Sequence, residues 1–477
     1  MRPGRLRRYT RAFGCLLAFG LACGVAFPEQ PQGRTRVELV GIAPIASSAA
    51  QGASGAQESQ QEQLEQEIER LLQQAETQRQ QAPQAPELGA GLGARLSALN
   101  PNITVIGDVL GQISSAPDAF DVPGKLLHAD LGEGDPDDFR VRAVELLATA
   151  AVDPFADALL KLDFGAEGVE VEEAYILFHD YPFRDRLPEA LRDVHTKVGL
   201  FRMNLGPVNL TDEHDLPTVD RPFVQQRFFG SEGLIRPGLS FSKLLTERGG
   251  WTPELTVEFV NGQPLDMEEE EPPLTVNGID RPLGLVHVKV FREWDPAVGW
   301  ESRVGQTRWP AYGDGYRTLD VGFSFVATGS RAEGDSTLYS VIQGIDVMWT
   351  WMDPRPDIYS EWMIQFEGYV SELEHPQGGS RGDLGAYLLY QYRWARQWYG
   401  GLRFDATEVP LIDGYQLAAT AYVTYFLTEF NRIRLQYQWL RQNLEDGPSG
   451  TAHSGWVQFV FAYGAHPPEP YYIRQRF

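Results

Sequence analysis

A short polar segment, residues 209–220, contains the densest group of side chains in this sequence that could do chemistry. It reads NLTDEHDLPTVD, with His214 flanked by carboxylates. An imidazole and carboxylates can bind Zn²⁺, so His214, Asp212 and Asp215 are candidate metal ligands. Ligands adjacent in sequence do not easily converge on one ion, however, and no second histidine follows at helical spacing. We favour the alternative of a structured loop, whose proline and aspartates set turn geometry, and we expect no cofactor.

Catalytic motifs are missing from the sequence. We find no nucleophile elbow, no phosphate-binding loop and no HExxH pattern. Glu172 and Glu173 could pair with Asp212 or Glu213 as glycosidase carboxylates, but nothing in the sequence fixes their separation. We therefore predict that the protein is not an enzyme.

Charged residues also recur within segments of strict alternation. Arg432 and Arg434 alternate with Ile433 and Leu435, and residues 456–463 continue the pattern. Alternation at period two indicates strands with one apolar and one polar face. In a soluble sandwich the apolar face turns inward, whereas in an outer-membrane barrel it faces lipid and the polar face lines a wet lumen. The large aromatic residues and the rows of arginine and glutamine favour the barrel.

In such a barrel the charged side chains must face the interior, because an arginine against lipid at the midplane would cost about 2–4 kcal/mol. The residues predicted to line the pore are Lys289, Glu258, Glu361, Glu367, Arg403, Asp405, Arg432 and Arg434. Their mixed signs do not favour anion selectivity. The long segment 206–237 is expected to fold inward and form the constriction, lined by Asp220, Arg221 and Arg227.

The elements that would position these residues are sixteen predicted strands, with residues 300–309 as a possible additional strand. Connections should alternate between short turns on the periplasmic side and long outer loops such as 114–138, 206–237 and 262–281. Tryptophans near strand ends, among them Trp394 and Trp398, fit an interfacial girdle. The predicted strands are 102–113, 139–151, 154–164, 169–180, 195–205, 238–245, 251–261, 282–294, 317–328, 337–352, 359–373, 383–394, 397–405, 414–427, 431–443 and 454–464.

Composition agrees with an exported barrel. Beyond the N-terminus no apolar run reaches the roughly twenty residues that a membrane helix needs. The formal net charge is −24, and loss of five leader arginines would leave about −29, which argues against nucleic-acid binding. Both cysteines, Cys15 and Cys23, lie in the leader, so the mature chain would have no disulfide.

The chain before the barrel divides into four parts. Residues 1–26 have the pattern of a signal peptide, with lipoprotein cleavage at Cys23 as the alternative. A low-complexity linker, 27–59, precedes a heptad pattern at 60–82 that predicts a coiled-coil stem beneath a homotrimer; the alternative is a solvated helix. A Pro/Gly linker, 83–101, leads to the barrel at 102–467, and 468–477 form a C-terminal tail.

Several blocks resemble a family of bacterial outer-membrane porin-like proteins related to the phosphate-selective porins, some labelled zinc-regulated or TonB-dependent. The resembling blocks are NPNI (100–103) with VIGD (105–108), VEVEEAY (169–175), KVGLFRMNL (197–205), EHDLPTVDRPFVQQRFFGSEGL (213–234), WYGGLRFD (398–405) and QFVFAYGAHP (458–467). The resemblance implies a barrel that follows a signal peptide and often a coiled-coil stem. This sequence departs from a TonB-dependent receptor because it has no plug of a hundred residues before the barrel.

The sequence therefore predicts an all-β transmembrane barrel in the outer membrane of a Gram-negative-type envelope. Its expected function is passive diffusion of small polar solutes or ions. A metal-linked receptor and an anchoring barrel with a closed lumen are the alternatives. The expected partners are outer-membrane lipid, two further copies of the chain and, through the stem, the periplasm or cell wall.

Overall fold

A computed structural model describes the residues that build the barrel. They are residues 102–115, 138–165, 168–261, 282–294, 316–333, 336–353, 359–374, 380–410, 413–428, 430–444 and 449–464. The predicted signal peptide, linkers, coiled-coil stem and C-terminal tail, and the possible strand at 300–309, lie outside these residues.

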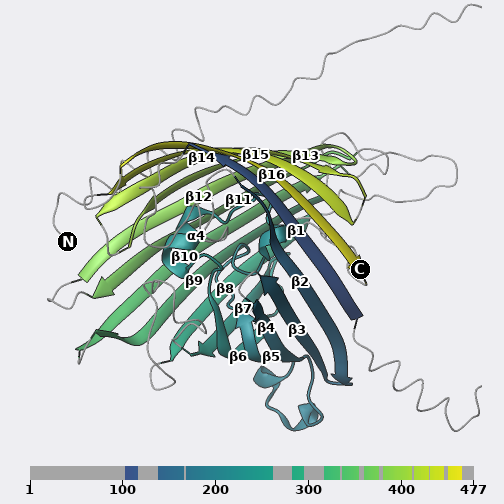
Figure 1. Cartoon of the computed structure of the whole chain (residues 1–477). Helices are drawn as coiled ribbons and strands as arrows, with labels where there is room; N and C mark the ends of the chain where they lie inside the picture. The colour runs from purple at the N-terminus through teal and green to yellow at the C-terminus, as the bar shows by residue number, and fades with distance from the viewer. Residues whose placement is uncertain are drawn as a thin grey trace, which may run out of the picture. The chain divides into compact units, whose positions relative to one another are not determined.

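Sixteen antiparallel strands form one closed barrel (Figure 1). Each strand pairs with its neighbours in sequence, and β1 closes the ring by pairing with β16, for example Asp108 with Val460. The predicted all-β barrel of sixteen strands is confirmed. The strands are β1 (Asn102–Ser114), β2 (Asp138–Asp153), β3 (Ala156–Gly165), β4 (Gly168–Phe178), β5 (His195–Arg202), β6 (Ile235–Leu244), β7 (Thr252–Val260), β8 (Leu283–Trp294), β9 (Tyr316–Glu333), β10 (Ser336–Met352), β11 (Glu361–Glu374), β12 (Ser380–Ala395), β13 (Trp398–Glu408), β14 (Gly414–Phe426), β15 (Asn431–Leu444) and β16 (Gly450–Gly464).

The alternation of side chains fixes which face of each strand turns outward. In β15, Leu435 is 56% exposed and Tyr437 is 50% exposed, whereas Arg434 and Gln436 are buried. A register slip of one residue would exchange these two sets. The exterior is therefore apolar and the interior polar, the arrangement typical of a membrane barrel.

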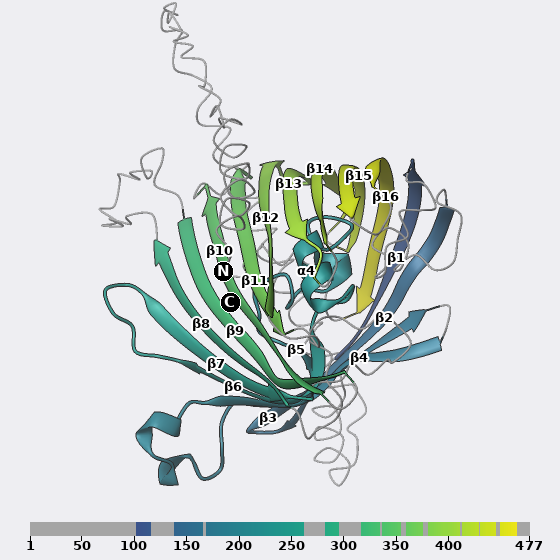
Figure 2. The ribbon, with the colours of Figure 1, turned by 90° about the vertical axis from the view of Figure 1, so that its left-hand side faces the viewer.

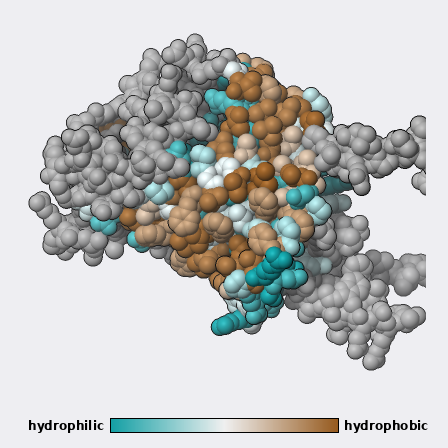
Figure 3. Space-filling model, turned by 90° about the horizontal axis from the view of Figure 1, so that it is seen from below, coloured by the Kyte–Doolittle hydropathy of each residue, from teal (hydrophilic) through white to brown (hydrophobic). Residues whose placement is uncertain are grey.

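A belt of exposed apolar residues surrounds the barrel, and Figure 3 shows one largely hydrophobic face with hydrophilic residues grouped at its edge. Among the described residues, no helix is long and apolar enough to cross a membrane. The belt includes Leu160, Val198, Leu239, Phe259, Val288, Phe325, Val370, Leu402, Leu435 and Val457.

Aromatic side chains gather at the barrel end where β2, β6, β12 and β14 finish. Trp394 stacks on Trp398 across the turn between β12 and β13, and Trp251 meets Trp294 edge to face. Rings at this position suit the boundary between lipid and water. The connection 179–194 also leaves this end; it contains two short turns, η3 (Arg184–Arg186) and η4 (Glu189–Leu191).

At the opposite end, the connection between β5 and β6 turns into the barrel. We call residues 203–234 the inserted segment. It contains a single 3₁₀ turn, η5 (Glu213–Asp215), and one short helix, α4 (Phe223–Phe229), all of whose residues are buried. Figure 2 shows α4 inside the ring of strands, and it packs against β11, β12 and β13.

Candidate functional site

The inserted segment begins and ends at a neck closed by one asparagine. Asn209 Nδ2 donates to the carbonyls of Met203 (2.7 Å) and Leu234 (3.2 Å), and the Leu234 amide donates to Asn209 Oδ1 at 2.7 Å. Gly233 has φ +84° and lies so close that an added Cβ would be 2.4 Å from Asn209 Oδ1. The neck thus requires glycine at 233 and holds both ends of the segment together.

One side of the inserted segment is apolar and packs on the wall formed by β7 to β12. Phe228 and Phe229 are almost fully buried, and Phe229 meets the Tyr369 ring edge to face with centroids 5.0 Å apart. This packing is unusual for the inside of a barrel whose interior is otherwise polar. The segment contributes Leu205, Val208, Val224, Phe228 and Phe229 to the cluster, and the wall contributes Val260, Leu283, Leu285, Val326, Ile342, Met363 and Leu389.

Two glutamates on the same wall bind the backbone of the segment. Glu367 on β11 accepts from the Val208 amide at 3.0 Å, from Gln225 Nε2, and from the hydroxyls of Tyr369 and Tyr387. Glu258 on β7 accepts from the Asn204 amide at 3.1 Å. Both carboxylates are buried and are therefore stabilised by hydrogen bonds instead of water.

Further round the ring, on β13 and β15, the segment is bound by arginine and glutamine. Arg403 on β13 donates to the Asp220 carboxylate (2.6 Å) and to the Asp220 carbonyl (2.7 Å). Gln436 and Gln438 on β15 donate to the same carboxylate at 2.7 and 3.0 Å. Asp405 accepts from the Phe223 amide at 3.1 Å. Because β15 lies eight strands from β7 in the ring of sixteen, the inserted segment crosses the lumen from wall to wall.

Two β-bulges in the barrel wall direct further charged side chains toward the region of the inserted segment. In the pairing of β1 with β2, Asp108 faces Ala143 and Val109 faces Val141, so Arg142 is the extra residue. In the pairing of β3 with β4, Glu172 is extra in the same way. A bulge re-aims a side chain relative to the strand's alternation, and both side chains point into the barrel. Arg142 Nη1 donates to the Val219 carbonyl at 2.7 Å.

Where the inserted segment meets β2 to β5, an ionic cluster surrounds Lys161 on β3. Its ammonium lies 2.9 Å from Glu145, 2.6 Å from Glu172 and 2.6 Å from Asp212. Arg202 contacts Glu172 and, at 3.2 Å, Asp212. The cluster joins β2, β3, β4 and β5 to residue 212 of the inserted segment.

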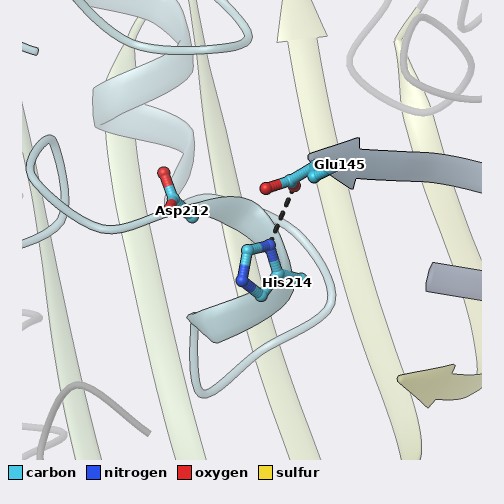
Figure 4. Close-up of side chains that lie close together, drawn as sticks. All are labelled: Glu145, Asp212 and His214. Atoms are coloured by element: carbon cyan, nitrogen blue, oxygen red, sulfur yellow. Dashed lines mark hydrogen bonds and ion pairs between the residues drawn. The ribbon is translucent and has the colours of Figure 1, made fainter. Parts of the chain in front are cut away.

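His214 completes the cluster as a cation. Its Nδ1 lies 2.8 Å from Glu145 Oε1 (Figure 4) and its Nε2 lies 3.3 Å from Asp215. Burial alone would lower the pKa of His214, but the carboxylates of Glu145 and Asp215 outweigh it and raise this pKa to about 10. For Asp212 burial likewise opposes ionisation, yet Lys161 and Arg202 hold its pKa far below the usual value.

The structure brings together a possible metal-ligand group that differs from the predicted one. Ligand atoms of Glu145, Asp212 and His214 lie within 4.8 Å of one another (Figure 4), whereas Asp215 is not in this group. Lys161 already neutralises two of these residues, and a protonated imidazole cannot bind a metal. A divalent ion would have to displace the ammonium and deprotonate His214, so the residues fit an internal salt-bridge cluster better than a zinc site.

The predicted pore-lining residues all face the interior, but most of them contact other protein groups. Glu258, Glu367, Arg403, Asp405 and Arg432 bind the inserted segment; for Arg432 the partner is Asp215 at 3.4 Å. Lys289 pairs with Glu254 at 2.9 Å and Glu361 with Arg393 at 3.5 Å. Arg434 donates to Thr424 and Gln458.

Of the residues predicted to line the constriction, Asp220 lies at the contact with Arg403. Arg221 is directed into the segment, donating to the carbonyls of Val208 and Thr211, both at 2.8 Å. Arg227 donates to Gln416 on β14 at 3.0 Å. Sequence reasoning missed Lys161, Glu145, Arg142 and Arg202. The available signal was that each is a charged residue within a predicted strand.

Comparisons with known proteins find relatives at low similarity. No family model matches the chain. An uncharacterized protein of Aquifex aeolicus is 24% identical over 370 residues, which is 70% of each chain.

The chain is also similar to a number of solved structures, including the following three. An anion-selective porin from Comamonas acidovorans has a TM-score of 0.47 and 11% identity, covering 76% of this chain and 99% of that one. The channel DcaP of Acinetobacter baumannii has a TM-score of 0.44 and 10% identity, covering 76% and 97%. OmpF of Salmonella typhi, in complex with daunomycin, has a TM-score of 0.43 and 10% identity, covering 77% and 99%.

Proposed function

We propose that this protein is an outer-membrane channel through which small polar solutes or ions diffuse, with the inserted segment as its constriction. The observation that carries the proposal is the segment itself, which crosses a polar barrel interior and bears charged residues at the crossing. Salt bridges to β3 and β13 hold it there, through Asp212 and Asp220. Charged side chains at a narrowing select solutes by size and charge.

Several further features belong to the same proposal. The apolar belt and the aromatic end support a position in a lipid bilayer, and a leader at 1–26 would direct export to the outer membrane. Residues 60–82 act as a coiled-coil stem that holds three copies together and reaches into the periplasm. A relationship to the phosphate-selective porin group, expected from the resembling blocks, is part of the same proposal.

A second candidate function is an anchoring barrel with a closed lumen. It is favoured by the burial of the inserted segment, in which Phe228 and Val224 have no exposed area and Arg221 has 1%. The third candidate, a metal-linked receptor, is disfavoured because Lys161 and protonated His214 occupy the only group of potential ligands that we find among the described residues.

Single-channel conductance separates the first two candidates. The mature chain, refolded and inserted in a planar bilayer, is compared with a variant in which a short Gly-Ser linker replaces residues 207–230. We expect small, stable conductance steps for the mature chain and larger steps for the variant.

The other outcomes are equally informative. A silent mature chain with a conducting variant would establish the closed barrel. Silence from both, with correctly folded and inserted protein, would contradict any channel function.

A further inference from the structure

The acidic and basic residues at the crossing differ sharply in exposure. The carboxylates of the inserted segment keep contact with water: the side chains of Asp212, Glu213, Asp215 and Asp220 are 27%, 22%, 21% and 17% exposed. The cations that pair with them do not: Lys161, Arg202, Arg142, Arg403 and Arg432 are between 1% and 6% exposed.

The cations are buried because further groups surround them. Besides Asp220, Arg403 donates to Thr218 Oγ1 and, at 2.8 Å, to Asp405, whose side chain has no exposed area. Lys161 lies between Glu145 and Glu172 as well as Asp212. Arg142 is paired with Asp108, which is 2% exposed. Carboxylates of the barrel strands, including Asp405, Glu145 and Asp108, thus neutralise these cations on the side that faces the wall.

The segment carboxylates therefore present the charge that a passing ion meets. A charge that faces water acts on nearby ions, whereas one enclosed by counter-charges and hydrogen-bond partners is largely cancelled. Another interior pair is Lys289 with Glu254, whose side chains are 32% and 22% exposed. Its two opposite charges cancel, so it adds no net charge to the interior. The acidic excess of the whole chain, with a net charge of −24, acts in the same direction.

We propose that Asp212, Glu213, Asp215 and Asp220 make the constriction cation-selective, so that the permeating solutes are inorganic cations or small organic cations. This inference rests on the proposed channel function. Acidic side chains at a narrowing favour cations by raising their local concentration and lowering that of anions.

The test is the reversal potential of the refolded mature chain across a potassium chloride gradient. We expect a reversal potential whose sign shows that potassium ions permeate more readily than chloride ions. Glu213→Gln and Asp215→Asn are the variants of choice, because their ionic contacts are long: 3.5 and 3.6 Å for Glu213, 3.3 and 3.4 Å for Asp215. Each should lower the cation-to-anion permeability ratio on the order of twofold, and the double variant should lower it further.

A matched control removes one negative charge elsewhere. Asp185→Asn, on the exposed connection 179–194, should leave the ratio unchanged. A conducting wild type with anion preference, or a double variant with the wild-type ratio, overturns the cation inference and leaves the channel intact. A folded, inserted chain that shows no conductance overturns both.

Discussion

The two sides of the inserted segment are held in the barrel by different physics. Toward β7–β12 the segment packs Phe228, Phe229 and Val224 into an apolar cluster. Toward β2–β5, its Asp212 binds Lys161 and Arg202, and its charged His214 binds Glu145. Apolar packing is insensitive to pH and to moderate salt, whereas ionic contacts depend on protonation and on complete pairing. The apolar side should therefore set whether the segment stays in place, and the ionic side should set how it responds to solution conditions.

The largest effect should come from the apolar side. Phe228→Ala leaves a cavity between α4 and the wall, and we expect the free energy of unfolding to fall by about 4 kcal/mol. Denaturant-induced unfolding in detergent measures this loss. Phe325→Ala, which truncates a ring that is 47% exposed on the exterior, should cost much less; an equal cost would remove the distinction between core and belt.

The ionic side should respond nearly as strongly when its central cation is removed. Lys161→Met preserves the volume but leaves Glu145, Glu172 and Asp212 without their shared partner. We expect a loss of about 3 kcal/mol, because breaking a buried pair leaves uncompensated charge. Lys289→Met is the control, since that lysine is 32% exposed with one partner. Adding Glu145→Gln to Lys161→Met should recover part of the stability; no recovery would mean that the cluster does not act as a unit.

Alkaline pH should weaken the ionic side alone. The pKa of His214 is raised to about 10 in the folded chain from an ordinary value of 6.5, so its contribution is complete below about pH 6.5 and is lost as the pH rises toward 10. We expect the free energy of unfolding of wild type to fall by about 3 kcal/mol between pH 7 and pH 10. His214→Gln should start lower at pH 7 and lose correspondingly less over the same interval, and parallel curves would show that His214 is not the titrating group.

The smallest expected effect is that of zinc. Since Lys161 and His214 supply the positive charge that Glu145 and Asp212 need, Zn²⁺ at neutral pH should leave the unfolding midpoint unchanged. Isothermal titration checks the same point directly. A clear stabilisation that His214→Ala abolishes would restore the metal site as a hypothesis.

Much of the fold could be predicted because lipid-facing strands obey a local rule. Alternation shows which way Arg434 and Leu435 face, and strand ends follow from turn residues such as Asp153 and Pro154. The bulges at Arg142 and Glu172 could not be predicted, since an extra residue in a pairing shows only when both strands are in register. The sequence likewise singled out His214, but not its partner Glu145, which lies 69 residues away.

The sequence by itself determined the all-β class, the sixteen strands, the inward direction of the charges and the length of the connection that enters the barrel. These properties depend on period-two alternation and on the cost of charge in lipid, which act residue by residue. Only the tertiary structure decided what the interior charges do. Closure of the barrel brings β3 and β13 within reach of one segment, so that Lys161 and Arg403 bind Asp212 and Asp220. Such pairings depend on distances across the lumen, which no local pattern encodes.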